Sequence, residues 1–239
     1  EIGTSGEYFD EANLANGTNS NAAALTKSIV IPNGYTPDLS ASEGWSQSGG
    51  RYVKSVGDGY LSWQNGKMTY TRTSPVDHGV QGRDSVDKTM GQVKLQDDSG
   101  NTFDVNLKLT IRDDMPDIHI RNSSGQEINQ VTVGGNFTAS GNIARQYGAD
   151  GTLGNSGSGE SLKVLVSMGG SSFEKTVSFN ANGQGSFDTY NGTVTLTRNA
   201  NGIGYSYTAR HGKAGDAEKL KFTVTDREGD IDTADLTLT

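Results

Sequence analysis

One stretch of this sequence occurs twice, as VKLQDDSGNTFDVNLKLT at residues 93–110 and as FTVTDREGDIDTADLTLT at residues 222–239. When the second copy is laid over the first, apolar positions coincide, and Asp97 and Gly100 fall on Asp226 and Gly229. The repeat indicates a tandem duplication. A chain of 239 residues then divides into two domains of roughly 115 to 125 residues, each large enough for its own core.

Each copy is predicted to form a β-hairpin, because apolar and polar residues alternate on both arms of an acidic, glycine-containing turn. If residues 227–229 form a three-residue loop with the glycine in the left-handed conformation, Asp226 and Asp230 become a cross-strand pair. Side chains two positions apart share a face of a strand, so Asp232 continues the same row. Three carboxylates would then extend the core-facing row at one end of the hairpin.

Two carboxylates in directly opposed positions repel each other unless a cation lies between them. Calcium fits, because it takes about six to eight oxygen ligands from flexible acidic turns. The alternative is a solvated turn whose Asp and Gly residues serve turn geometry alone. The candidate calcium ligands are Asp226, Glu228, Asp230 and Asp232 in the second turn, Asp97, Asp98 and Asn101 in the first, Asp113, Asp114 and Asp117 at the domain junction, and Asp10 and Glu11 near the start.

The fold class follows from the glycine content and the short apolar runs. The chain has 33 Gly and 32% hydrophobic residues, and about seven short strands per domain alternate with turn signals. We therefore predict an all-β protein of two tandem immunoglobulin-like β-sandwich domains. Pro116 keeps the junction extended, so the expected domains are residues 1–116 and 117–239.

The formal charge of -8 and the absence of Cys limit the possible partners. An acidic chain without a basic patch is not expected to bind nucleic acid, and no apolar run is long enough to insert into a membrane. Without Cys, stability must come from packed cores or from hard metal ions. We expect a monomer. Because the chain begins without Met and ends in mid-strand, we also expect it to be a piece of a longer protein.

Four short motifs suggest a family: DEANLANGT at residues 10–18, TIRDDMP at 110–116, YGADG at 147–151 and VTDREGD at 224–230. Together they resemble the repeats of very large bacterial adhesins exported by type I secretion (RTX-type adhesins). The resemblance implies a secreted, cell-surface segment that acts in adhesion or biofilm formation. It also implies calcium at turns and junctions, and neighbouring repeat domains of the same chain as partners.

Carried over to this sequence, the resemblance makes Asp226, Asp230 and Asp232 the family's acidic turn. It likewise makes Asp113 and Asp114 the family's junction acids. The first copy departs from the pattern, since its DDSGN lacks an acidic residue after the glycine, and this puts its metal in doubt.

Catalytic signatures are missing from the sequence. It contains no G-x-S-x-G elbow, no H-E-x-x-H motif and no P-loop. His78 and His211 hold matching positions beside glycines, and a structural turn role is the simpler interpretation of both than a catalytic one. We therefore predict that the chain is not an enzyme.

Two functions remain open. The first is a structural extender, in which calcium stiffens a row of domains. The second is a module that binds a host or biofilm glycan or protein through loops such as residues 33–50 or 148–159. Trp45 in the first loop is the candidate ligand-binding residue, since an exposed ring can stack on a sugar, whereas a ring folded back onto the sandwich would only cap it.

Overall fold

The computed structural model describes residues 2–76, 78, 85–151, 160–199, 202–210 and 216–239. Within these ranges nearly all regular structure is β, and the helical segments are two 3-10 turns, η1 (Glu11–Asn13) and η2 (Ala22–Leu25). The all-β prediction is confirmed. No helix in these ranges is long and apolar enough to cross a membrane.

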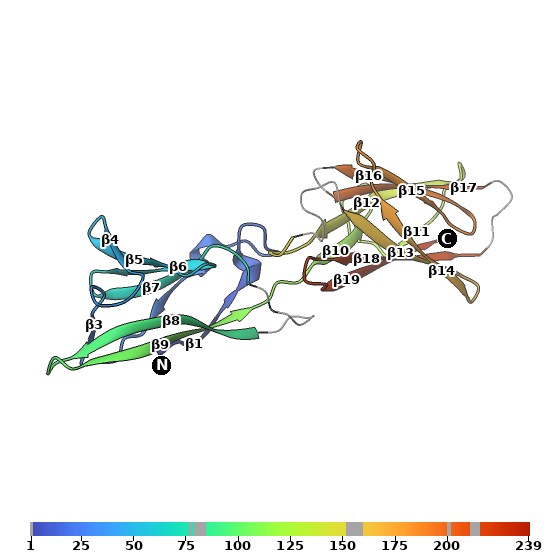
Figure 1. Ribbon diagram of the computed structural model, residues 1–239. Helices are drawn as coiled ribbons and strands as arrows, with labels where there is room; N and C mark the ends of the chain where they lie inside the picture. Colours follow the sequence, from blue (N-terminus) through green and yellow to red (C-terminus); the bar gives the residue numbers. More distant parts are fainter. Residues whose placement is uncertain (1, 77, 79–84, 152–159, 200–201, 211–215) are drawn as a thin grey trace. The chain divides into compact units, whose positions relative to one another are not determined.

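The chain separates into two compact units, Glu1–Asp114 and Met115–Thr239. The boundary in the sequence thus falls slightly before Pro116. Each unit contains two sheets, drawn as separate layers in Figure 1. In the first unit, one sheet consists of β1 (Ile2–Asp10), β9 (Thr102–Arg112), β8 (Ser85–Asp97) and β3 (Tyr35–Pro37), in that order. The other consists of β2 (Thr26–Ile29), β7 (Lys67–Arg72), β6 (Gly59–Gln64), β5 (Arg51–Ser55) and β4 (Ser46–Ser48).

The second unit is built in the same way. One sheet consists of β11 (Gln130–Val131), β19 (Ile231–Leu238), β18 (Glu218–Thr225), β13 (Ser161–Met168) and β14 (Ser171–Ser178). The other consists of β10 (Asp117–Arg121), β12 (Thr138–Gln146), β17 (Gly202–Ala209), β16 (Gly192–Asn199) and β15 (Gln184–Asp188).

The strand orders of the two units correspond. The order β1-β9-β8-β3 matches β11-β19-β18-β13, and the order β2-β7-β6-β5 matches β12-β17-β16-β15. In both units an early strand, β1 or β11, pairs in parallel with the last strand, β9 or β19. The units differ at their edges, where β4 extends one sheet, and β14 and β10 extend the sheets of the second unit. The repeated stretch therefore forms the β8–β9 hairpin in one unit and the β18–β19 hairpin at the matching place in the other.

The apolar positions of the repeated stretch lie in the core of each unit. The buried residues are Val93, Leu95, Leu107 and Leu109 in the first unit and Phe222, Val224, Leu236 and Leu238 in the second. Side chains from both sheets join them in a single cluster per unit. Alternation along the strands thus predicted correctly which face each hairpin buries.

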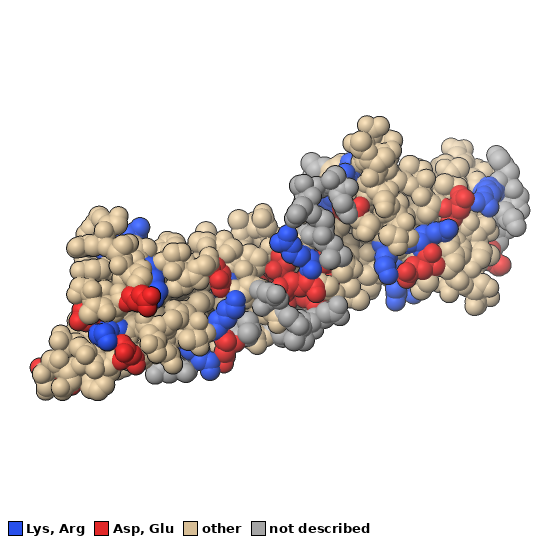
Figure 2. All heavy atoms as spheres, viewed as in Figure 1, with Lys and Arg blue, Asp and Glu red and all other residues tan. Residues whose placement is uncertain are grey.

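Charged side chains of both signs lie on the face of the molecule seen in Figure 2. On the face seen in Figure 2 most of each unit is neutral, and Lys or Arg lies beside Asp or Glu in several places. Exposed pairs such as Lys94 with Asp104, at 2.8 Å, are of this kind. Isolated surface pairs contribute little to stability.

Candidate metal centres

The turn of the β18–β19 hairpin places two carboxylates inside the second unit. The Asp226 N–H donates to the Asp230 carbonyl at 2.9 Å, so residues 227–229 form the loop, and Gly229 has a φ of 98°. Asp226 is fully buried and Asp230 is 2% exposed. The left-handed glycine closes the loop, as expected for a three-residue hairpin connection.

Asp226 organises this turn through one of its two carboxylate oxygens. Its Oδ1 accepts the backbone N–H groups of Glu228, Gly229 and Asp230, each at 2.9 Å. Its Oδ2 is buried and has no hydrogen-bond partner among the described residues. Burial raises the pKa of Asp226, and the negative charge of Asp230 raises it further. An ionised Asp226 is therefore disfavoured at this position unless a cation is present.

Asp232 and Glu228 flank this pair. The Asp232 Oδ2 accepts the N–H of Ile118 at 2.9 Å, which ties the hairpin to the start of β10. Glu228 is half-buried in the loop itself. The residues that could hold an ion here are therefore Asp226 and Asp230, with Asp232 and Glu228 beside them in the chain.

The first copy of the turn has the same backbone and a different carboxylate environment. The Asp97 N–H donates to the Asn101 carbonyl at 2.9 Å, and Gly100 has a φ of 85°. The Asp97 Oδ1 accepts the N–H groups of Ser99 and Asn101, and its Oδ2 accepts the Asn101 side-chain amide at 2.9 Å. Hydrogen bonds from the Asn101 side chain and backbone lower the pKa of Asp97. Both oxygens of the Asp97 carboxylate thus accept hydrogen bonds from within the turn. The neighbouring Asp98 is exposed.

A second group of ionisable side chains is buried at one end of the first unit. Glu11 begins η1 directly after β1, Asp113 follows β9, and these two strands are parallel neighbours, with Asp10 opposite Arg112. His78 joins them from the segment after β7. One ligand atom from each of Glu11, His78 and Asp113 lies within 4.8 Å of the others, and all three residues are buried.

Backbone and side-chain contacts fix Glu11. Its Oε1 accepts the Val76 N–H at 2.7 Å and lies 3.4 Å from Arg72 Nη2, and its Oε2 lies 3.5 Å from His78 Nε2. Arg72 is buried as well and donates to the Ser74 carbonyl at 2.5 Å. The sequence favoured a structural turn role for His78, because it lies beside a glycine. The fold, not the spacing, brings it to Glu11.

The other predicted ligands of the first unit hold its entry loop. Asp114 is fully buried and accepts both the N–H and the hydroxyl of Thr18, at 2.9 and 2.5 Å. Asp10 caps η1 by accepting the Ala12 N–H at 3.0 Å. Hydrogen bonds thus fix both ends of the DEANLANGT motif. Asp114 binds Thr18 at its end, and Glu11 binds the Val76 N–H near its start.

Asp117, the remaining junction residue, belongs to the second unit. Its carboxylate lies 2.9 Å from His119 Nε2, and His119 Nδ1 lies 3.1 Å from Glu127. All three side chains are substantially exposed. The hydrogen bond to Glu127 is the largest cause of the raised pKa of His119.

The candidate ligand loops have mixed outcomes. Trp45 is half-buried and packs against the first core, so much of its ring caps the sandwich. Residues 152–159 of the second predicted loop and His211 lie outside the described residues.

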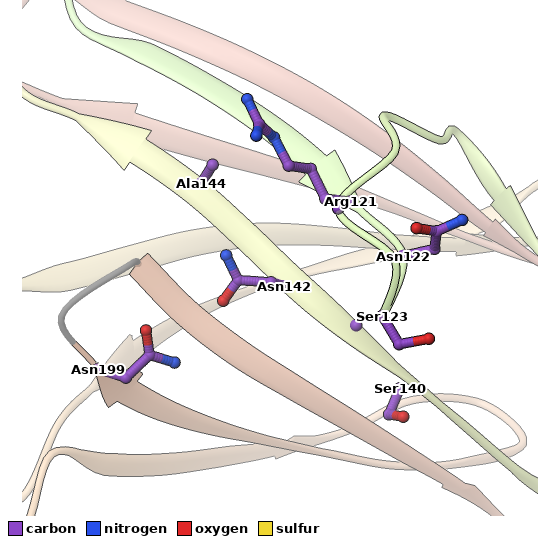
Figure 3. A pocket seen from close by; sticks show the side chains of 9 residues that line it. Arg121, Asn122, Ser123, Ser140, Asn142, Ala144 and Asn199 are labelled. Atoms are coloured by element: carbon purple, nitrogen blue, oxygen red, sulfur yellow. The ribbon is translucent and has the colours of Figure 1, made fainter.

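Sequence reasoning missed a hollow of about 810 Å³ over the sheet that contains β10 and β12. Figure 3 shows Arg121, Asn142 and Asn199 around it, from β10, β12 and the end of β16. Ser140 and the turn after β10 complete the lining, in which the described residues include no aromatic ring and no carboxylate. The only signal in the sequence was the density of Asn and Ser, which also marks ordinary turns.

No family model and no curated protein matches the chain. Among solved structures it is similar to an "Endo-fucoidan hydrolase MfFcnA9 from glycoside hydrolase family 107", at 12% identity and a TM-score of 0.26. The match covers 87% of this chain and 28% of that structure.

This match contradicts the prediction that the chain is not an enzyme, because the matched protein is a hydrolase. The absence of familiar catalytic motifs was a weak basis for that prediction, since catalytic residues need not occur in short sequence motifs. The prediction no longer stands. At this TM-score the likeness carries no argument about a substrate or about catalytic residues of this chain.

Proposed function

We propose that the chain is a calcium-stabilised structural segment of a bacterial cell-surface adhesin, built from two immunoglobulin-like β-sandwich repeats. The observation that carries the calcium site is the buried pair of Asp226 and Asp230, with Asp226 Oδ2 unpartnered among the described residues. Calcium coordinates carboxylate oxygens in turns of this kind. The ion would neutralise a pair that burial and mutual repulsion otherwise disfavour.

The comparison between the two hairpin turns supports this proposal. In the first turn Asn101 supplies an amide N–H to the Asp97 Oδ2, at 2.9 Å. In the second turn Asp230 stands at the same position, and an ionised carboxylate has no proton to donate. A cation can replace the missing donor. We therefore place calcium in the second turn and not in the first.

The adhesin part of the proposal rests on two further supports. One is the resemblance of four motifs to RTX-type adhesin repeats. The other is the matching strand order of the two units, which suits a chain extended by repetition. In this proposal the partners are neighbouring repeats of the same chain, and the place of action is the bacterial surface.

Thermal melting in calcium, magnesium and chelator tests the calcium site. Extracellular modules bind calcium at about 0.1 to 1 mM, so about 5 mM calcium approaches saturation. At about 5 to 50 times its Kd the ion adds about 1 to 2.3 kcal/mol, which corresponds to a rise of about 4 to 12 °C for a domain of this size. Magnesium should substitute poorly, because it requires tighter octahedral geometry. A melting temperature indifferent to calcium would refute the proposal.

A second candidate function is ligand binding in the polar hollow beside β10 and β12. Arg121 is the cation of its lining, and Asn142 and Asn199 bring amide groups to it. Without aromatic rings for stacking, such a surface suits a ligand with carboxylate or sulfate groups more than a neutral sugar. The occupant proposed is an acidic glycan.

A glycan array with acidic and neutral members distinguishes this function from the structural one. We expect acidic members to bind the native chain and Arg121→Gln to weaken that binding at least about tenfold, since a charge-assisted contact is lost. Lys163→Gln is the control, because Lys163 is exposed on β13 and pairs with Glu174 at 3.2 Å. Equal binding by native and Arg121→Gln chains would remove the hollow from consideration.

A further inference from the structure

We propose that Glu11, His78 and Asp113 form a site for a divalent transition-metal ion of the zinc type, separate from the calcium turn at Asp226. The sequence grouped Glu11 and Asp113 with the calcium ligands and gave His78 a structural role. The fold brings the three together, with one ligand atom from each within 4.8 Å of the others.

The ligand chemistry selects the class of metal. An imidazole nitrogen with two carboxylate oxygens suits Zn²⁺ and its transition-metal neighbours, whereas calcium takes oxygen ligands in larger number. Around a tetrahedral zinc with bonds of about 2.0 to 2.2 Å, neighbouring ligand atoms lie about 3.3 to 3.6 Å apart. Glu11 Oε2 and His78 Nε2 are separated by 3.5 Å, which falls within that range. Three protein ligands would leave one position for water.

The balance of buried charge also favours a divalent ion. Glu11, Asp113 and Asp114 are all 0% exposed, and Arg72, at 1% exposed, is the buried guanidinium beside them. Arg72 Nη1 also lies 3.7 Å from Asp58 Oδ2, so this guanidinium is shared among carboxylates. Asp58 and Lys88, partly exposed beyond Arg72, lie 3.8 Å apart and offset each other. Burying several carboxylates close together is costly unless cations lie among them, and a divalent ion would add such charge.

The positions of the ligands are set by the fold before any ion arrives. The Val76 N–H holds the Glu11 carboxylate at 2.7 Å, and the parallel pairing of β1 and β9 sets Glu11 beside Asp113. Asp114, one residue on, is held by Thr18. Binding would therefore require little rearrangement of the backbone, which limits the entropy cost of assembling the site.

Zinc titration by calorimetry tests the proposal on the full chain, in a buffer with about 5 mM calcium to occupy the calcium site. We expect one zinc per chain, with a Kd of about 1 μM or below. His78→Gln should weaken zinc binding at least about 100-fold, because removing a ligand costs more than removing an outer-shell contact. Circular dichroism establishes that the variant is folded.

Two control variants separate this site from others. His119→Gln removes the exposed imidazole that lies near Asp117 and Glu127, and it should leave zinc binding unchanged. Asp230→Asn alters only the calcium turn and should also leave zinc binding unchanged, so the two metal proposals can fail independently. Equal zinc affinity in the native and His78→Gln chains would overturn the assignment, and so would loss of zinc binding in His119→Gln.

Cobalt(II) gives a readout on the native chain that does not depend on a variant folding. A four-coordinate nitrogen and oxygen site gives strong visible absorption, which zinc should abolish by displacement. Weak absorption typical of hydrated cobalt, or a native chain that binds no zinc, would overturn the proposal. The cluster would then be a network of ion pairs in which a proton on His78 takes the place of the metal.

Discussion

Asn101 and Asp230 occupy the same position in two turns of the same backbone form, and this difference bears directly on how each turn satisfies its leading aspartate. Asn101 donates an amide N–H to Asp97, whereas Asp230 brings a second negative charge to Asp226. The substitution Asp230→Asn should therefore give the second turn the amide donor that the first turn has. It would give Asp226 a neutral donor in place of a cation.

We predict that Asp230→Asn stabilises the metal-free chain by about 1 kcal/mol, the usual net value of one intramolecular hydrogen bond. Urea unfolding in excess chelator measures the difference. Asp98→Asn, on the exposed part of the first turn, is the matched control and should change nothing. If Asp230→Asn were less stable than the native chain in chelator, the repulsion assigned to the pair would be wrong.

Glu160 supports the second unit without any metal. Its carboxylate accepts hydrogen bonds from Arg145 at 2.5 and 2.9 Å and from Tyr147 at 2.7 Å, and Arg198 lies 3.6 Å away. Burial alone would raise the pKa of Glu160, but the bonds from Arg145 and Tyr147 outweigh it and lower the pKa. We predict that Glu160→Gln destabilises the second unit by about 3 kcal/mol, because it leaves the partly buried Arg145 without its charge partner.

The pH dependence of this difference follows from the sign of the shift. A carboxyl whose folded pKa is lowered stabilises the fold above its unfolded pKa, and the stabilisation is lost as pH falls through the folded pKa. Native and Glu160→Gln chains should therefore differ most near pH 7, and the difference should begin to shrink below about pH 4 and go on shrinking as pH falls further. Denaturation at several pH values across that range measures the difference in free energy of unfolding between the two chains. A difference that stays constant down to pH 3 would contradict the prediction.

At the scale of elements, the hairpins are where sequence and structure agree most closely. Asn65 and Gly66 link β6 to β7 with φ values of 53° and 74°, as a two-residue loop with both positions left-handed requires. We predict that Gly66→Ala costs about 1 kcal/mol and that Asn65→Gly is nearly neutral, because only the alanine is strained there. Thermal unfolding of the first unit measures both. Equal stability of the two variants would contradict this account of the turn.

Local patterns predicted the two hairpins of the repeated stretch because alternation and turn chemistry act between neighbours in sequence. The cross-strand pairing of Asp226 with Asp230 needed only the loop length, and so it was predictable. The grouping of Glu11, His78 and Asp113 depends on which strand ends meet, and no local pattern encodes the parallel pairing of β1 with β9. The burial of Glu160 among Arg145, Tyr147 and Arg198 could not be predicted either, because it also depends on which strands become neighbours.

At the scale of the whole molecule, each unit has its own core and its own pair of sheets. We predict that residues 1–114 and 115–239, produced separately, each unfold in one cooperative transition. The calcium response should remain with 115–239, which contains Asp226 and Asp230. Circular dichroism melts of both fragments measure this. A fragment without a cooperative transition, or a calcium response confined to 1–114, would contradict it.

The most direct test of the central claim is a calorimetric titration of calcium into the native chain and into Asp230→Asn. The native chain should bind calcium saturably, with a Kd of about 0.1 to 1 mM, the range of extracellular calcium modules. Asp230→Asn should lose that binding, because it removes a charged ligand and satisfies Asp226 with an amide instead. Equal calcium binding by the two chains, or none by the native chain, would contradict the account.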